Sequence, residues 1–259
     1  MDHDATARLW EQNAETWTQL TRAGYDTCRT SFNTPRFLEA LPPVSTLRGL
    51  DIGCGEGCNT RAVAALGPHM DAVDVSPTFI RHASRTEADR PLGIRYHVAS
   101  AHALPFDDAT FDFAVAFMSF MDIPDPDKTF AEARRVLKPG GFLQFSILHP
   151  CFCTRLRRWI TEDGRRVGVL CGEYWNNDPW AEEWTFGAAP PEVRQQVPKF
   201  RTVCVMRTMS QWVNTLLAAG FRLDWMGEPR PTVEEARGHR GLESDRTAAN
   251  FLHIRAIRD

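Results

Sequence analysis

Three glycines and two carboxylates lie together in one short segment, residues 50–57, which reads Leu-Asp-Ile-Gly-Cys-Gly-Glu-Gly. Glycines at 53, 55 and 57 allow the backbone to turn sharply and to approach a ligand closely. Asp51 and Glu56 place acidic side chains around this turn. Asp74 follows about twenty residues later, where a carboxylate can accept both hydroxyls of a ribose. The segment therefore predicts a site for a ligand that contains a nucleoside.

The identity of that ligand depends on the third glycine and on charge. Enzymes that bind dinucleotides need a glycine three residues after the second one, and Cys58 stands there. A pyrophosphate at this helix N-terminus would be repelled by the two carboxylates, whereas an ammonium and a sulfonium would be attracted. S-adenosylmethionine carries both cations, so the charge pattern favours it over a nicotinamide cofactor.

The elements that must position this turn alternate between strands and helices. Alternation of this kind is typical of a doubly wound α/β fold with a parallel sheet. Ser76 is expected to cap one helix and Asp127 the next, and Lys138-Pro139-Gly140-Gly141 to end the latter. The predicted strands are 47–52, 70–75, 94–98, 111–117 and 142–148, and the predicted helices between them are 58–66, 76–88 and 127–137.

The flanking segments complete a four-part organisation. Trp10, Ala14, Trp17 and Leu20 recur at helical spacing, so residues 5–22 are expected to form an amphipathic helix. A short helix at 35–41, a hairpin around Asp163-Gly164, a helix at 210–219 and strands at 221–226 and 251–257 are also expected. We divide the chain into an N-terminal helical lid (1–45), a cofactor-binding core (46–150), an aromatic-rich insert acting as substrate cap (151–208) and a C-terminal part that completes the sheet (209–259).

Composition limits the classes of function. A net charge of -3 gives no reason to expect a nucleic-acid partner, and no apolar run approaches the length of a membrane span. Seven cysteines without regular spacing argue against a disulfide framework and a metal site, and they fit a reducing compartment. With no signal-peptide core, we expect a cytoplasmic protein, a monomer or homodimer, that acts on a small molecule.

Residues 47–148 resemble the class I S-adenosylmethionine-dependent methyltransferases, specifically the small-molecule branch related to the ubiquinone and menaquinone methyltransferases. The resemblance implies a seven-stranded, mostly parallel sheet whose last strand, 251–257, runs antiparallel between the fifth and the sixth. It rests on five motifs in order, which are Asp51 to Gly57, Val73-Asp74-Val75-Ser76, Ala103-Leu104-Pro105-Phe106, Phe111-Asp112 and Leu137-Lys138-Pro139-Gly140-Gly141.

The same resemblance implies roles at the cofactor. Gly53, Cys54 and Gly55 would line its methionine end, Asp74 would hold the ribose and Val75 would flank the adenine. The family commonly has an acidic residue at the position of Ser100, as acceptor for the adenine amino group. A serine can also accept this hydrogen bond, but it gives weaker selectivity for adenine. The residues that we expect at the cofactor are Asp51, Gly53, Cys54, Gly55, Asp74, Val75, Ser100, Ala101, His102 and Phe117.

Methyl transfer from a sulfonium is an in-line displacement, which mainly requires that the nucleophile is positioned and water excluded. A base helps if the acceptor is a hydroxyl or a protonated amine, and is superfluous for a carboxylate. His149, just past the predicted fifth strand, is the candidate base, although it could instead only shape the turn with Pro150. Tyr25, Tyr174 and Trp175 are the candidate substrate contacts.

Several alternatives remain open on the residues alone. Trp17 could anchor the first helix in the core or help to close the cofactor pocket. The tryptophans of the insert could line an acceptor site or form a satellite core. The chain could also be a nicotinamide-dependent oxidoreductase, a non-catalytic module that binds S-adenosylmethionine, or, through Cys151, Cys153 and Cys171, an arsenite methyltransferase. A nucleic-acid methyltransferase is disfavoured because residues 119–124 lack the polar-Pro-Pro-aromatic signature.

Overall fold

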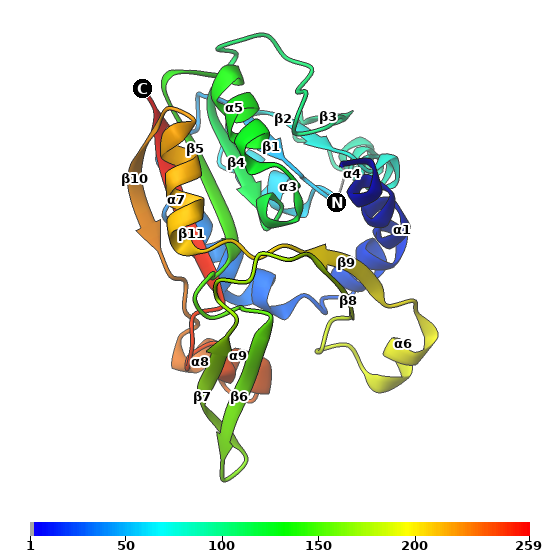
Figure 1. Ribbon diagram of the computed structural model, residues 1–259. Coiled ribbons are helices and arrows are strands. Elements are labelled where there is room, and N and C mark those ends of the chain that lie inside the picture. Colours follow the sequence, from blue (N-terminus) through cyan, green and yellow to red (C-terminus); the bar gives the residue numbers. More distant parts are fainter. Residues whose placement is uncertain (1–2) are drawn as a thin grey trace.

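A computed structural model describes residues 3–259 as a seven-stranded sheet with helices on both faces (Figure 1). The strand order is β10-β11-β5-β4-β1-β2-β3, and only the pairs that involve β11 are antiparallel. The predicted doubly wound fold and the antiparallel last strand are therefore confirmed. The strands are β1 (Arg48–Ile52), β2 (His69–Asp74), β3 (Arg95–Val98), β4 (Phe111–Phe117), β5 (Leu137–Leu148), β10 (Phe221–Gly227) and β11 (Phe251–Arg258).

Successive side chains of the central strand β4 pack on opposite faces of the sheet, in two separate hydrophobic cores. This follows from the two-residue period of a strand. Ala114 and Ala116 lie in the core under α5 (Pro126–Val136) and α7 (Met209–Ala218). Phe113 and Phe117 lie in the opposite core. That core is covered by α2 (Thr34–Glu39), α3 (Cys58–Ala64) and α4 (Pro77–Asp89).

The remaining helices lie at the ends of the sheet or in the connections. None of the helices within residues 3–259 is both long and apolar enough to cross a membrane. The longest, α1 (His3–Arg22), packs against α4 and against the insert strand β9 (Phe200–Cys204) (Figure 1). The others are the π-helix η1 (Arg29–Asn33), the 3-10 helix η2 (Phe120–Asp122), α6 (Pro191–Gln196), α8 (Val233–Ala236) and α9 (Arg240–Ser244).

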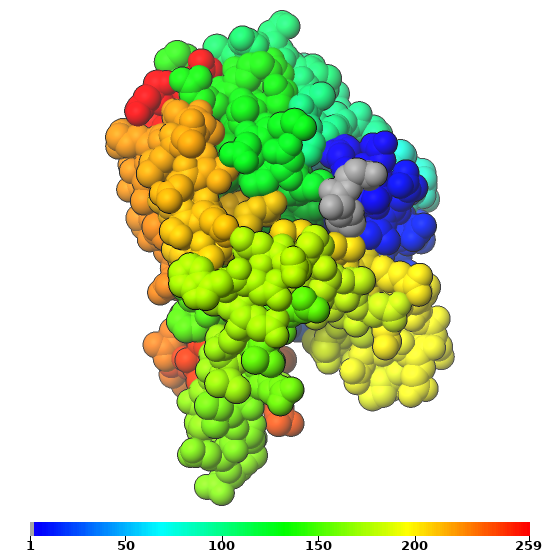
Figure 2. Space-filling model, viewed as in Figure 1, coloured from blue at the N-terminus to red at the C-terminus, as the bar shows by residue number. Residues whose placement is uncertain are grey.

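The insert after β5 forms two hairpins that leave the sheet in different directions. The first pairs β6 (Leu156–Glu162) with β7 (Arg165–Gly172) around the predicted Asp163-Gly164 turn. The second pairs β8 (Trp180–Trp184) with β9 (Phe200–Cys204). In Figure 2 the β6–β7 hairpin projects from the body, and the yellow lobe containing α6 and the β8–β9 region lies against the blue N-terminal helix.

The predicted N-cap of the helix α5 is wrong. Asp125, not Asp127, is the N-cap, and its side chain accepts the backbone N–H of Lys128. Pro126 takes the first helical position, which its fixed φ favours. The helix ends at Val136, just before the Lys138–Gly141 segment, but this segment is already part of β5, where the register with β4 shifts between Phe111 and Phe113.

Candidate active site

A cavity of about 580 Å³ opens at the carboxyl ends of β1, β2 and β4. This is the edge at which open α/β sheets bind their ligands. The turn after β1, the helix α1 and the strands β8 and β9 all contribute residues to the lining of the cavity. The cavity therefore joins the glycine-rich turn, the N-terminal helix and the insert.

The glycine-rich turn leaves open space beside Gly55. Gly53 and Gly55 both have positive φ, +77° and +54°, which L side chains rarely adopt. A Cβ added at Gly55 would meet no atom within 4 Å, whereas one at Gly53 would lie 2.4 Å from the Cβ of Ser119. The turn is thus tightly packed at Gly53 and open to a ligand at Gly55.

Asp74 ends β2 beside this turn and lines the cavity. Its carboxylate accepts the backbone N–H of Gly55 at 2.9 Å and that of Ser76 at 2.9 Å. Burial raises the pKa of Asp74 to about 6 despite these two hydrogen bonds. The side chain is therefore held in one orientation, with acceptor capacity left for hydroxyl groups.

Asp51, which we expected at the cofactor, is not among the residues that line the cavity. Its side chain is buried beneath the turn, where Thr60 donates a hydrogen bond of 2.6 Å to one carboxylate oxygen. Within residues 3–259 the other oxygen has no hydrogen-bond partner, and burial raises the pKa of Asp51 to about 7. Alternation along β1 explains this position, because Asp51 points away from the turn that follows it.

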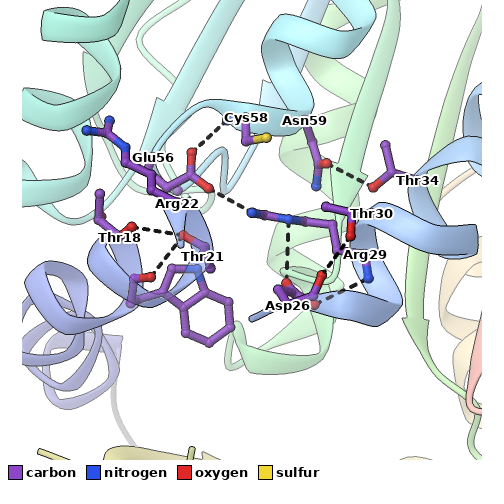
Figure 3. Close-up of polar contacts among 12 residues, drawn as sticks. Thr18, Thr21, Arg22, Asp26, Arg29, Thr30, Thr34, Glu56, Cys58 and Asn59 are labelled. Carbon is purple, nitrogen blue, oxygen red and sulfur yellow. Dashed lines mark hydrogen bonds and ion pairs between the residues drawn. The ribbon is translucent and has the colours of Figure 1, made fainter. Parts of the chain in front are cut away.

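Glu56 faces the cavity but is paired with a cation that the sequence did not predict. Arg29 donates a hydrogen bond of 2.7 Å to Glu56, and its guanidinium lies 3.5 Å from Asp26 (Figure 3). Glu56 also accepts the backbone N–H of Cys58. All four residues line the cavity. The turn is therefore less acidic than its sequence suggests, because Arg29 balances one of the carboxylates.

The adenine side differs in part from expectation. Val75, Ala101 and Phe117 line the cavity, as does Cys54. Ser100 and His102, by contrast, are absent from its lining. Ser100 bonds to His3 at 2.7 Å, and the Nε2 of His102 donates to the carbonyl of Pro124 at 2.6 Å. These partners, supplied by α1 and the loop before α5, turn both side chains away.

Aromatic side chains from α1 and the insert form one wall of the cavity. The ring of Trp17 lies 5.7 Å from that of Trp184 and 5.0 Å from those of Phe186 and Phe200, measured between centroids. Trp17, Trp184 and Phe186 line the cavity, with Trp10 beside them. The ring of Trp17 therefore packs α1 against the insert and also borders the cavity.

The candidate base and substrate contacts lie elsewhere. His149 is 2% exposed and outside the cavity lining. Its Nε2 is 2.9 Å from Glu228, and its Nδ1 accepts the N–H of Cys151. These contacts favour the turn-shaping alternative for His149, and its catalytic role stays a prediction.

Three aromatic candidates are also outside the cavity lining. Tyr25 packs with Leu20 and Phe186 in the cluster behind Trp17. The hydroxyl of Tyr174 accepts the N–H of Met209, and Trp175 is 78% exposed. The aromatic residues that the insert contributes to the cavity lining are Trp184 and Phe186.

A carboxylate at the end of β4 joins the site instead. Asp122, the last residue of η2, lines the cavity, and burial raises its pKa to about 7. Sequence reasoning missed Asp122 because no residue type near it signals an active site. It missed Arg29 because the pairing with Glu56 spans 27 residues.

Comparison with known proteins shows what the central part of the chain is similar to. Residues 50–145 match the family of methyltransferase domains. The chain is 34% identical to the ubiquinone biosynthesis O-methyltransferase of Parvibaculum lavamentivorans, over 50% of this chain and 51% of that protein. It is 38% identical to the demethylmenaquinone methyltransferase of Clavibacter sepedonicus, over 39% and 41% of the two chains.

A solved structure matches more of the chain. The S-adenosylmethionine-dependent methyltransferase from Mesorhizobium loti superposes with a TM-score of 0.69 at 25% identity, covering 86% of this chain and 96% of that one. The chain therefore has the fold of the class I S-adenosylmethionine-dependent methyltransferases, and its residues 50–145 are similar to their methyltransferase domain. The chain spans about half the length of the curated relatives that it matches, or less.

Proposed function

We propose that this protein transfers the methyl group of S-adenosylmethionine to a nucleophilic atom of a small, largely apolar molecule. The observation that carries the proposal is one cavity that is lined by two unlike sets of residues. Asp74, Gly55 and Arg29 supply polar groups, and Trp17, Trp184 and Phe186 supply apolar surface.

The polar residues suit the charges and hydroxyls of the cofactor. Asp74 is held by two backbone N–H groups and can accept from the ribose hydroxyls. The open space at Gly55 would admit the methionine portion. Among the cavity-lining residues of the described chain, Arg29 is the only arginine or lysine, so it is the partner we assign to the cofactor's carboxylate.

The cation of the cofactor also has partners among the polar residues of the cavity. Asp26 and Glu56 flank Arg29, and both line the cavity. One of these carboxylates can turn to the ammonium group when Arg29 binds the carboxylate. Binding would thus replace ion pairs within the Asp26–Arg29–Glu56 cluster by ion pairs with the carboxylate and the ammonium group of the cofactor.

The aromatic residues support an apolar and planar acceptor. The named relatives are a ubiquinone biosynthesis O-methyltransferase and a demethylmenaquinone methyltransferase, and a quinone-like ring would fit such a wall. Bound S-adenosylmethionine supplies an electrophilic methyl group. The aromatic wall would hold the acceptor in line with that methyl group and keep water out.

Titration calorimetry tests the binding step. We expect S-adenosylhomocysteine to bind with a dissociation constant in the micromolar range or below, roughly -8 kcal/mol or better, and NADH not to bind. Asp74→Ala should weaken binding by about tenfold or more, about 1.4 kcal/mol, while Asp89→Ala, an exposed site on α4, should not. Unchanged binding by Asp74→Ala would remove the ribose assignment, and NADH binding would favour an oxidoreductase.

A further inference from the structure

Asp122 is the carboxylate that the proposed function leaves unexplained. It follows β4 through a turn in which Met118 has a φ of +54°, a conformation that non-glycine residues rarely adopt. The turn is held by three hydrogen bonds. The N–H of Met118 donates to the carbonyl and hydroxyl oxygens of Ser146, and the hydroxyl of Ser119 donates to the carbonyl of Ile52 at 2.7 Å. The chain is thus directed across the cavity.

The helix η2 that carries Asp122 is firmly anchored. Phe120 is 1% exposed and packs on Phe130 and Phe145, with ring centroids 5.5 and 5.3 Å apart. The sulfur of Met121 accepts the N–H of Leu148. The backbone of Asp122 is therefore fixed in front of the cavity, as a reacting group requires.

The carboxylate itself has no hydrogen bond or ion pair with any residue from 3 to 259. Asp122 is half-buried and lines the cavity, so its carboxylate is available to a ligand bound there. Its pKa is raised to about 7 by burial alone. A carboxylate with such a pKa is ionised in part near neutral pH and can take up a proton there.

Other ionisable groups near Asp122 come from the insert and from α1. Cys204 on β9 is close enough for Asp122 and Glu182 to raise its pKa, after burial, to about 12, and its thiol donates to Glu182. All three residues line the cavity, and His3 of α1 lines it as well. β5, which also packs on η2, has no ionisable side chain between Phe142 and Leu148. No cation in this set neutralises Asp122.

We infer that Asp122 is the general base of the reaction and that the acceptor carries its nucleophile as a hydroxyl or an amine N–H rather than as a carboxylate. This inference rests on the proposed function. A lone pair of the acceptor oxygen or nitrogen forms the bond to the methyl carbon, and the carbon–sulfur bond breaks with its electron pair remaining on sulfur. The proton lost by the acceptor passes to the Asp122 carboxylate, which later releases it to water.

Three probes with the same flat body separate these nucleophiles, namely 2-naphthol, 2-naphthylamine and 2-naphthoate. Their binding to the complex with S-adenosylhomocysteine can be followed by fluorescence, independently of turnover. We expect wild-type protein to bind 2-naphthol and 2-naphthylamine at least about fivefold more tightly than 2-naphthoate, because the Asp122 carboxylate accepts a hydrogen bond and repels a second carboxylate. D122N should abolish or reverse that preference.

A pH series reports the charge on Asp122 directly. From roughly pH 5.5 to 8.5, 2-naphthoate stays ionised, so its own charge does not change. Its affinity for the wild-type complex should fall as the pH rises through about 7, where Asp122 ionises, and should stay flat for D122N. D127N removes an exposed carboxylate from the first turn of α5 and should behave as wild type.

Turnover adds a second readout. D122N should slow methyl transfer to 2-naphthol by about 10²- to 10⁴-fold with unchanged affinity for S-adenosylhomocysteine. Any of three results would overturn the inference. These are methyl transfer by D122N at the wild-type rate, a D122N preference for 2-naphthol over 2-naphthoate equal to that of wild type, and failure of the wild-type complex to bind any of the probes. Failure of the wild-type protein to bind S-adenosylhomocysteine would instead overturn the proposed function.

Discussion

The hydroxyl of Ser119 donates a hydrogen bond of 2.7 Å to the carbonyl of Ile52, which links the turn after β4 to the turn after β1. Gly53 makes this contact possible, since a Cβ there would lie 2.4 Å from the Cβ of Ser119. The glycine-rich turn and the segment that carries Asp122 are therefore fixed relative to each other. In the proposed reaction, this link sets the position of the base relative to the methyl donor.

Two alanine substitutions in the turn should have different consequences. Gly53→Ala should lower the free energy of unfolding by about 2 kcal/mol or more, because the new methyl group meets Ser119 and the φ is positive. Gly55→Ala meets no protein atom and should cost about 1 kcal/mol, but its methyl group would enter the proposed cofactor site. Urea denaturation and calorimetry with S-adenosylhomocysteine measure the two effects. Normal binding by a folded Gly55→Ala would place the cofactor elsewhere.

Asp51 should make stability depend on pH. Burial raises its pKa from 3.8 to about 7, so the folded state binds the proton more tightly than the unfolded state. The stability gained in this way is complete below pH 3.8 and is lost as the pH rises through about 7. Asp51→Asn should therefore gain stability relative to wild type at about pH 8 compared with about pH 5, measured by denaturation at both pH values. An equal difference at the two pH values would contradict the raised pKa.

His149→Gln should retain methyl transfer. Both ring nitrogens of His149 are used within the loop, by Glu228 and by the N–H of Cys151, and the side chain is outside the cavity. We expect a loss of stability of about 1–3 kcal/mol and a kcat within about threefold of wild type. A fall in kcat of about 100-fold with unchanged cofactor affinity would instead support His149 as the base.

Trp17→Ala should loosen the contact between α1 and the insert. Its ring lies 5.0 Å from Phe186 and from Phe200, so truncation removes the centre of this cluster. A loss of about 3 kcal/mol is expected, with faster hydrogen exchange in β8 and β9. Trp175→Ala provides the matched control, because that ring is 78% exposed. Equal exchange in the two variants would show that Trp17 does not hold the insert.

The sheet could be predicted because its signals are local. Apolar runs and turn residues located the five parallel strands to within a few residues, except that β5 begins at Leu137. The antiparallel position of β11 was implied by the resemblance alone. The N-cap of α5 was harder to predict from the sequence. Asp125 and Asp127 can both cap a helix, and only the proline between them favours Asp125.

The site was less predictable because side-chain direction depends on distant partners. His149 follows β5 as expected, but Glu228 and Asn250 bind its ring and its N–H. Ser100 turns to His3, nearly a hundred residues away. Arg29 and Asp122 had no motif of their own, and only the folded chain brings them to the glycine-rich turn.

A crystal structure of the complex with S-adenosylhomocysteine tests the central claim most directly. The account predicts the ribose hydroxyls on Asp74, the amino-acid portion at Gly55 and Arg29, and the sulfur facing the space between Asp122 and the aromatic wall of Trp17 and Trp184. A ligand bound outside this cavity, or an adenosyl group that makes no contact with Asp74, would contradict it.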